Sequence, residues 1–185
     1  YVPHYLHSNG RAHSDPDDGG LIPEAPGNEP PDRFAYDPQD PVPTRGGNLS
    51  VQMMSQHAED PLLAGPVDQR SIEARADVLV YTSPALAKDL TIIGPIQVVL
   101  YAASSARDTD FTARLTDVDQ EGRSLVLCEG ILRGRYRKGT TKTELLEPEE
   151  VDEFKIELCP WALAELVIQI LNTVTDVTAI LRLAI

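Results

Sequence analysis

Hydrophobic and polar residues alternate in several segments between residues 77 and 158, and this alternation predicts β-strands. In residues 111–116, the apolar residues Phe111, Ala113 and Leu115 are separated by polar residues. Residues 153–158, Glu-Phe-Lys-Ile-Glu-Leu, alternate in the same way. A period of two is typical of a strand that buries one face and exposes the other.

Three further segments are strand-like in composition. Residues 77–83 are rich in β-branched and aromatic residues, and residues 91–103 form a long apolar run. Pro95 cannot donate a ladder hydrogen bond, so the strand in this run should begin near Ile96. Residues 124–137 follow a predicted turn at 119–122, and Val126, Cys128, Leu132 and Tyr136 share one parity there.

Because no helical pattern separates these segments, we expect an antiparallel all-β fold. With four to six strands and a long arm, the natural closure is a jelly-roll β-sandwich, in the galactose-binding-like class.

Residues 1–50 contain nine of the fifteen prolines and many acidic residues, which excludes a long helix. A disordered acidic linker is one interpretation. We favour a docked, mostly irregular arm with short strands, because six apolar residues could pack on a neighbouring surface. They are Tyr5, Leu6, Leu21, Ile22, Phe34 and Tyr36. Pro61, Gly65 and Pro66 predict a loop over 51–70.

The last residues differ from the rest of the chain. Pro160 suits the first position of a helix that could run to about residue 171, and residues 172–180 are β-branched. Three charged residues interrupt the apolar tail, so we do not predict a transmembrane span, which needs about 20 apolar residues. The expected division is therefore an arm (1–50), a sandwich (51–158) and an atypical apolar tail (159–185).

Composition excludes several function classes. A formal net charge of −13 argues against nucleic acid and against an anionic membrane surface as partners. Cys128 and Cys159 have neither disulfide-framework nor metal-site spacing and read as small core thiols. The sequence begins without Met and without a signal-peptide pattern, so we expect a fragment, or a processed or truncated chain.

Catalytic motifs are sparse. An α/β-hydrolase nucleophile needs G-x-S-x-G between a strand and a helix. The nearest match, Gly122-Arg-Ser124-Leu-Val126, lacks the second glycine and precedes a strand, so Ser124 is expected to be structural. The histidines are His4, His7, His13 and His57. A metal site could be drawn from His4 and His7 with Asp15 or Asp17, but an irregular arm does not hold ligands rigidly, and we favour surface or interface histidines.

Two charged groups have more than one interpretation. Asp108, Asp110, Asp117 and Asp119 could form a calcium loop, but strand-end caps are the simpler explanation. Arg133, Arg135, Arg137 and Lys138 could bind a substrate anion or form an interdomain stripe. Pairing with acids of the same chain, such as those in 144–153, is simpler. We therefore assign no catalytic, cofactor-binding or metal-binding residue, and no cofactor.

Several segments, in order and spacing, resemble the C-terminal domain of CocE/NonD-type serine hydrolases, the X-Pro dipeptidyl-peptidase and acyl esterase class. The resemblance covers about residues 4–158. It is carried by Tyr5-Leu-His-Ser-Asn-Gly-Arg-Ala and by residues 29–47 (Glu-Pro-Pro-Asp-Arg-Phe-Ala-Tyr through Pro-Val-Pro-Thr-Arg-Gly-Gly). It is also carried by Asp68-Gln-Arg, by residues 73–83 and 108–118, and by Gly130-Ile-Leu-Arg-Gly-Arg-Tyr-Arg.

The resemblance implies an accessory sandwich that packs on an upstream α/β-hydrolase domain, helps to wall its active-site cleft and often joins oligomer contacts. The family's Ser, Asp and His belong to that other domain, so no triad residue is carried over. After Leu158 the family pattern is lost. We expect two or three strands to be missing or replaced, through an altered reading frame, a mispredicted gene end or a divergent terminus. The alternative function is a stand-alone, lectin-like jelly-roll binding module.

Overall fold

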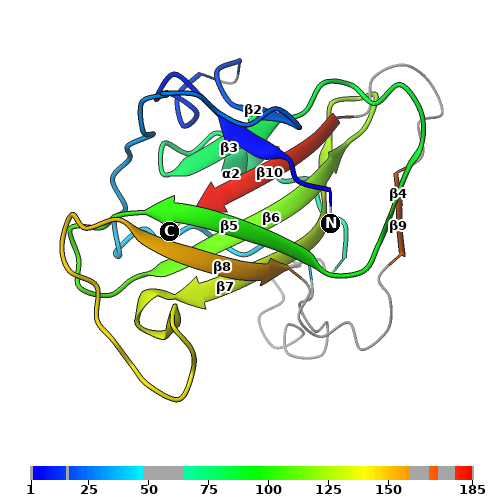
Figure 1. The fold of residues 1–185 in the computed structure, drawn as a ribbon. Helices are drawn as coiled ribbons and strands as arrows, with labels where there is room; N and C mark the ends of the chain where they lie inside the picture. The colour runs from blue at the N-terminus through cyan, green and yellow to red at the C-terminus, as the bar shows by residue number, and fades with distance from the viewer. Residues whose placement is uncertain (1, 16, 48–64, 159–166, 171–177, 185) are drawn as a thin grey trace.

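The computed structural model describes residues 2–15, 17–47, 65–158, 167–170 and 178–184, and these residues are almost entirely strands and loops (Figure 1). The helical elements are the single-turn helix α2 (Arg70–Glu73) and a 3₁₀ turn (Gly134–Tyr136). The strands are β1 (Tyr5–His7), β2 (Gly20–Ile22), β3 (Val78–Thr82), β4 (Leu90–Ile93), β5 (Ile96–Ala102), β6 (Asp110–Val118), β7 (Ser124–Arg133), β8 (Asp152–Leu158), β9 (Val167–Ile170) and β10 (Thr178–Ala184).

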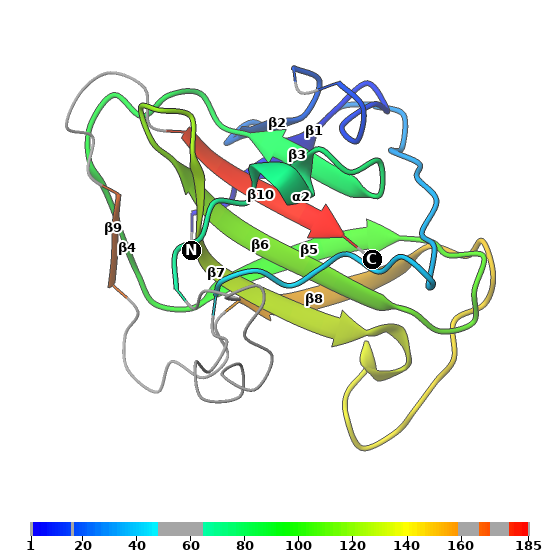
Figure 2. The same ribbon diagram turned by 180° about the vertical axis from the view of Figure 1, so that it is seen from behind.

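Six strands form one sheet in the order β1-β2-β3-β10-β6-β7, and all neighbours are antiparallel except β2 and β3. β5 pairs with β8 along seven residues and forms a second layer. This layer lies in front of the six-stranded sheet in Figure 1 and behind it in Figure 2. β4 and β9 pair as a separate two-stranded ribbon. The layers therefore make a β-sandwich.

The main core fills the space between the two layers. Phe154 and Ile156 of β8 are almost completely buried, and the Phe154 ring lies 4.4 Å from that of Phe111 on β6, centroid to centroid. Leu79 and Tyr81 of β3 belong to the same apolar cluster. Side chains from alternate positions of strands in both layers thus build one core, as the period of two predicts.

Part of the outer face of the six-stranded sheet, over β3, is covered by the chain itself. Ile72 of α2 and Val42 of the arm pack against Val78 and Val80, which point away from the main core. Figure 2 shows α2 and the last part of the arm crossing this face. β1 and β2 are the short strands expected in the arm, and Leu21 lies in the core.

Most strands in the middle of the chain lie where the sequence predicts them. β3, β5, β6 and β8 lie where predicted, and β5 begins at Ile96. The all-β class is confirmed, whereas the jelly-roll topology stays a prediction. Leu90–Ile93 forms a strand that was not predicted. The predicted strand 124–137 ends at Arg133, because the backbone turns into a 3₁₀ helix at Gly134.

The helix predicted at the start of the tail is wrong for its described part. Val167–Ile170, placed in a helix by the sequence, is the strand β9, because short apolar runs fit either structure and pairing with β4 decides. β10 lies between β3 and β6 and pairs with both, so the tail supplies a strand to the sheet. The expectation that family strands are missing or replaced after Leu158 stays a prediction. Most of the predicted loop 51–70 and the helix start at Pro160 lie outside the described residues.

Candidate functional site

Asp32 of the arm is the centre of a partly buried hydrogen-bond cluster. Its carboxylate accepts hydrogen bonds from the Ser8 hydroxyl (2.6 Å), the Tyr81 hydroxyl (2.7 Å) and the Ala12 backbone N–H (2.9 Å). Burial raises the pKa of the Tyr81 hydroxyl, and the hydrogen bond to Asp32 raises that pKa further. The Tyr81 hydroxyl therefore keeps its proton at physiological pH and remains a hydrogen-bond donor. The cluster joins two parts of the arm to β3.

His7 uses both of its ring nitrogens within the arm. Nδ1 lies 2.7 Å from Glu29 Oε1, and Nε2 lies 2.8 Å from the Glu24 backbone oxygen. The hydrogen bond to Glu24 is the largest cause of the raised pKa of His7, and His7 in turn lowers the pKa of Glu29. With both nitrogens occupied, His7 is a poor metal ligand, and the metal site drawn with His4 is not assembled.

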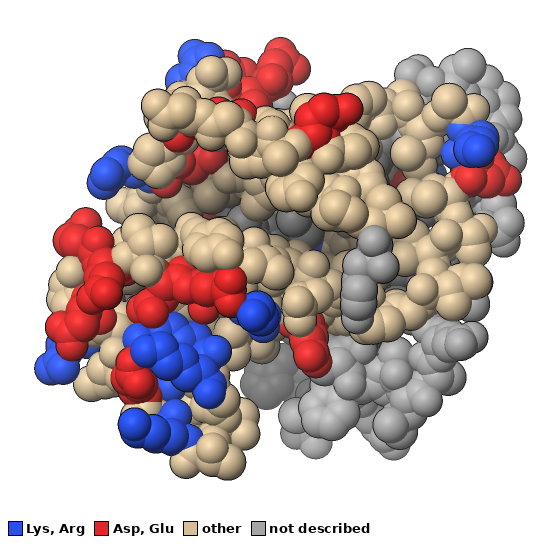
Figure 3. Space-filling model, in the orientation of Figure 1, with Lys and Arg blue, Asp and Glu red and all other residues tan. Residues whose placement is uncertain are grey.

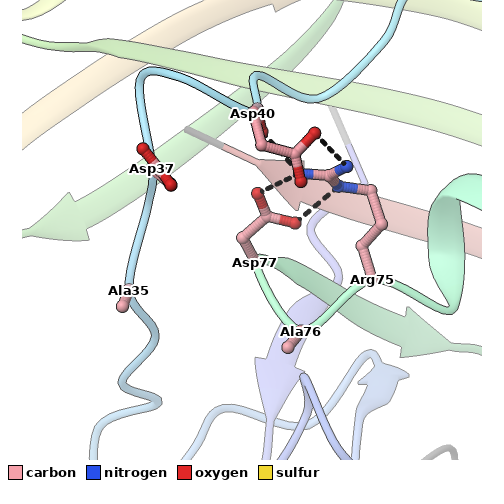
Figure 4. Close-up of a pocket in the computed structure, with 6 residues that line it drawn as sticks. All are labelled: Ala35, Asp37, Asp40, Arg75, Ala76 and Asp77. Carbon is pink, nitrogen blue, oxygen red and sulfur yellow. Dashed lines mark hydrogen bonds and ion pairs between the residues drawn. The ribbon is translucent and has the colours of Figure 1, made fainter.

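Arg75 fixes the middle of the arm beside the start of β3. It lines a hollow of about 260 Å³ together with Asp40 and Asp77 (Figure 4). Arg75 donates to both carboxylate oxygens of Asp77 (2.8 Å each) and to the Asp40 backbone oxygen (2.7 Å). These hydrogen bonds, chiefly those to Asp77, raise the pKa of the guanidinium above its usual range. Because its donors are used within the chain, Arg75 is not available to bind an external anion.

Gln69 is fully buried on the outer face of the sheet and holds the end of the arm. Its Nε2 donates to the backbone oxygens of Arg45 and Val67 (2.9 Å each). Its Oε1 accepts a hydrogen bond from Arg114 (2.9 Å), which also pairs with Glu129. Gln69 thus links the arm to the side chains of β6.

Ser124 is structural, as the sequence predicts. Its buried hydroxyl donates to Thr116 (3.0 Å), and its backbone N–H donates to Asp68 Oδ1 (3.1 Å). It begins β7 after a tight turn that contains Gly122, at a positive φ of 71°. No strand-to-helix elbow is present here, so Ser124 is not presented as a nucleophile.

The four aspartates around β6 do not converge. Asp108 and Asp110 lie at one end of the strand and pair with Arg135 and Arg133. Asp117 and Asp119 lie at its other end, roughly 25 Å away for a strand of this length. Burial, and then the charge of Asp119, raises the pKa of Asp117. The alternative of a calcium loop is therefore not realised, and the described residues contain no group of three or more His, Cys, Asp or Glu that could hold a metal ion.

Arg133, Arg135, Arg137 and Lys138 do not form the continuous stripe that was one alternative for them. Arg135 and Arg137 lie at and beyond the 3₁₀ turn, so they do not continue the face that Arg133 begins. Arg137 pairs with Asp152 (2.8 Å), and Lys138 pairs with Glu144, as predicted for acids of 144–153. All four cations are therefore paired within the chain.

Sequence reasoning missed the three residues that organise these contacts: Asp32, Gln69 and Arg75. All three lie inside the segments that carry the family resemblance, and this resemblance is the sequence feature that could have identified them. Of the histidines, His4 is exposed, His13 has a buried Nδ1 with no partner among the described residues, and His57 lies outside them. None of the described helices is both long and apolar enough to cross a bilayer.

The chain is similar to known proteins in sequence and in fold. Residues 1–164 match the family described as "X-Pro dipeptidyl-peptidase C-terminal non-catalytic domain". The cocaine esterase of Rhodococcus sp. (strain MB1 Bresler) is 40% identical over 158 residues, which is 85% of this chain and 26% of that protein.

Two solved structures share the fold over nearly the whole chain. An aminopeptidase from a marine sediment archaeon, Thaumarchaeota archaeon, superposes with a TM-score of 0.75 at 25% identity and covers 98% of this chain. An α-amino acid ester hydrolase gives a TM-score of 0.74 at 24% identity over 99% of it. This chain corresponds to 29% and 28% of those two chains, so it spans about a quarter of its relatives. The chain belongs to the family of X-Pro dipeptidyl-peptidase C-terminal non-catalytic domains, which accompany CocE/NonD-type hydrolases.

Proposed function

We propose that this chain is the accessory β-sandwich of a serine hydrolase that acts on acyl esters, amides or X-Pro peptides. Acyl transfer would proceed through a serine on a separate α/β-hydrolase domain, and the sandwich would supply part of the wall of the active-site cleft and stabilise the enzyme. Family membership over residues 1–164 is the observation that carries this proposal.

The contacts of the polar signature residues support a non-catalytic role. A catalytic side chain needs a free proton-accepting or nucleophilic atom in a cleft. Asp32, Gln69 and Arg75 instead direct their polar atoms to partners of the same chain. The signature is therefore explained by attachment of the arm, without a reaction on this domain.

Hydrolysis of p-nitrophenyl acetate tests the proposal. The 185-residue chain should show no activity above the buffer rate, whereas the protein that carries it behind a G-x-S-x-G domain should be active and blocked by a serine-directed phosphonate. Phosphonate-sensitive activity of the 185-residue chain would contradict the proposal. A start codon close to Tyr1 in the gene would favour the stand-alone binding module instead.

A further inference from the structure

The outer face of the layer formed by β5 and β8 carries exposed apolar side chains. In β5 and β8, Val98, Phe154 and Ile156 point into the core, so the residues of the other parity point outward. Three exposed apolar residues gather on this outer face, from β5 and from the residue before β8. They are Val99, Tyr101 and Val151, with 43%, 66% and 63% of their surfaces exposed.

Two charged residues of this face pair with each other, and Glu157, of the same parity on β8, is exposed as well. Glu153 accepts a hydrogen bond from the Tyr101 hydroxyl (2.7 Å) and pairs with Lys155 (2.8 Å). In the space-filling view, acidic and basic side chains extend from the left edge of the front face to the region of β8, and an area with few charges lies beside them (Figure 3). Exposed apolar side chains beside a paired acid and base are typical of an interface between domains.

The position of the face indicates its occupant. In this family the domain follows a catalytic domain, and β1 and the N-terminal end lie on the same side of the six-stranded sheet as β5 and β8 (Figures 1 and 2). On the opposite face, α2 and the arm already cover the part over β3. A preceding domain would therefore meet the β5–β8 face first.

We propose that the outer face of β5 and β8, centred on Val99, Tyr101 and Val151, docks against the catalytic hydrolase domain of the same polypeptide. This inference rests on the proposed function and adds to it the surface that makes the contact. The complementary surface on the hydrolase domain would be apolar at its centre and polar at its rim.

Ile131 provides a matched control on the opposite face. It is a β-branched residue on β7 with 64% of its surface exposed. It pairs with Thr112, and its neighbour Leu132 pairs with the core residue Phe111. Its side chain therefore points away from the core, on the far side of the sandwich from Val151.

The experiment compares Val151→Cys with Ile131→Cys in the full-length protein, by the rate at which a charged maleimide labels each new thiol. A covered face predicts labelling of Val151→Cys at least about tenfold slower than that of Ile131→Cys. Equal rates would overturn the docking face. Protection of Val151→Cys that disappears on dilution would assign the face to a second copy and would also overturn it.

A second pair of variants tests whether the contact stabilises the full-length enzyme. Val151→Lys should lower the temperature of half-inactivation of the full-length enzyme by about 5 °C, while Ile131→Lys leaves it within about 1 °C. Equal shifts would count against the proposal. A full-length protein without phosphonate-sensitive hydrolysis would refute the proposed function, whereas an active enzyme with equal labelling would refute only this face.

Discussion

Two tyrosines donate to carboxylates over the same distance in opposite surroundings. Tyr81 lies in the core and donates to Asp32, and Tyr101 lies on the surface and donates to Glu153, both at 2.7 Å. Water can replace a hydrogen bond at the surface, but it cannot reach a donor that is buried. The same bond should therefore differ in its effect on stability at the two positions.

Tyr81→Phe should lower the free energy of unfolding of the 185-residue chain by about 1.5–3 kcal/mol, the range for hydrogen bonds to charged groups. Tyr101→Phe should have no measurable effect. Urea unfolding of the two variants, read by fluorescence, makes the comparison. Indistinguishable midpoints for both variants would show that Asp32 does not hold the arm.

The Asp32 cluster also shows what the sequence could not reveal at this scale. Alternation identified Phe111, Ala113 and Leu115 as core residues, because parity is a local property. The partners of Asp32 are 24 and 49 residues away, at Ser8 and Tyr81. No local pattern encodes such a pairing, so only the family resemblance of its segment pointed to Asp32.

At the scale of elements, β7 and β8 approach each other closely at Gly130. A Cβ atom added at Gly130 would lie 2.1 Å from the backbone oxygen of Glu157, which is far inside contact distance. Because the obstacle is backbone, a side-chain rotation cannot relieve it. The absence of a side chain at Gly130 is therefore a condition for the packing of the second layer.

Gly130→Ala should destabilise the chain by about 1–3 kcal/mol, as overpacked sites do. Gly27→Ala is the control, since nothing lies within 4 Å of its added Cβ, and it should be neutral or slightly stabilising. Thermal unfolding by circular dichroism would measure both. A Gly130→Ala variant as stable as the control would mean that β7 and β8 do not pack this closely.

Hydrophobic alternation predicted the long strands, but it did not predict the register shift in β7 or the short strands β4 and β9. The register shifts where Leu115 pairs with Cys128 and Thr116 pairs with Val126, which leaves Leu127 as an extra residue on β7. Val126 therefore shares the outer face with Thr116, although the sequence pattern grouped it with Cys128. β4 and β9 escaped prediction because each has four residues and pairs with a segment about 75 residues away. Bulges and distant pairings are set by the tertiary structure, which local sequence does not contain.

For the whole molecule, the position of β10 determines whether the sheet is continuous. It comes from the end of the chain, yet it pairs along five residues with β3 and along seven residues with β6. Without it, the arm strands and β3 on one side would be separated from β6 and β7 on the other. The sheet would then have two additional unpaired edges.

Ending the chain after Leu158 should therefore abolish cooperative thermal unfolding and promote aggregation, because the interior strands β3 and β6 would become edges. Removing residues 1–4, which precede β1, is the control for loss of a terminus and should leave the unfolding transition nearly unchanged. Scanning calorimetry of the two truncations against the full chain distinguishes the effects. A chain ending at Leu158 with an unchanged transition would show that β10 contributes nothing to the sheet, and that the domain is complete without the segment where the family pattern is lost.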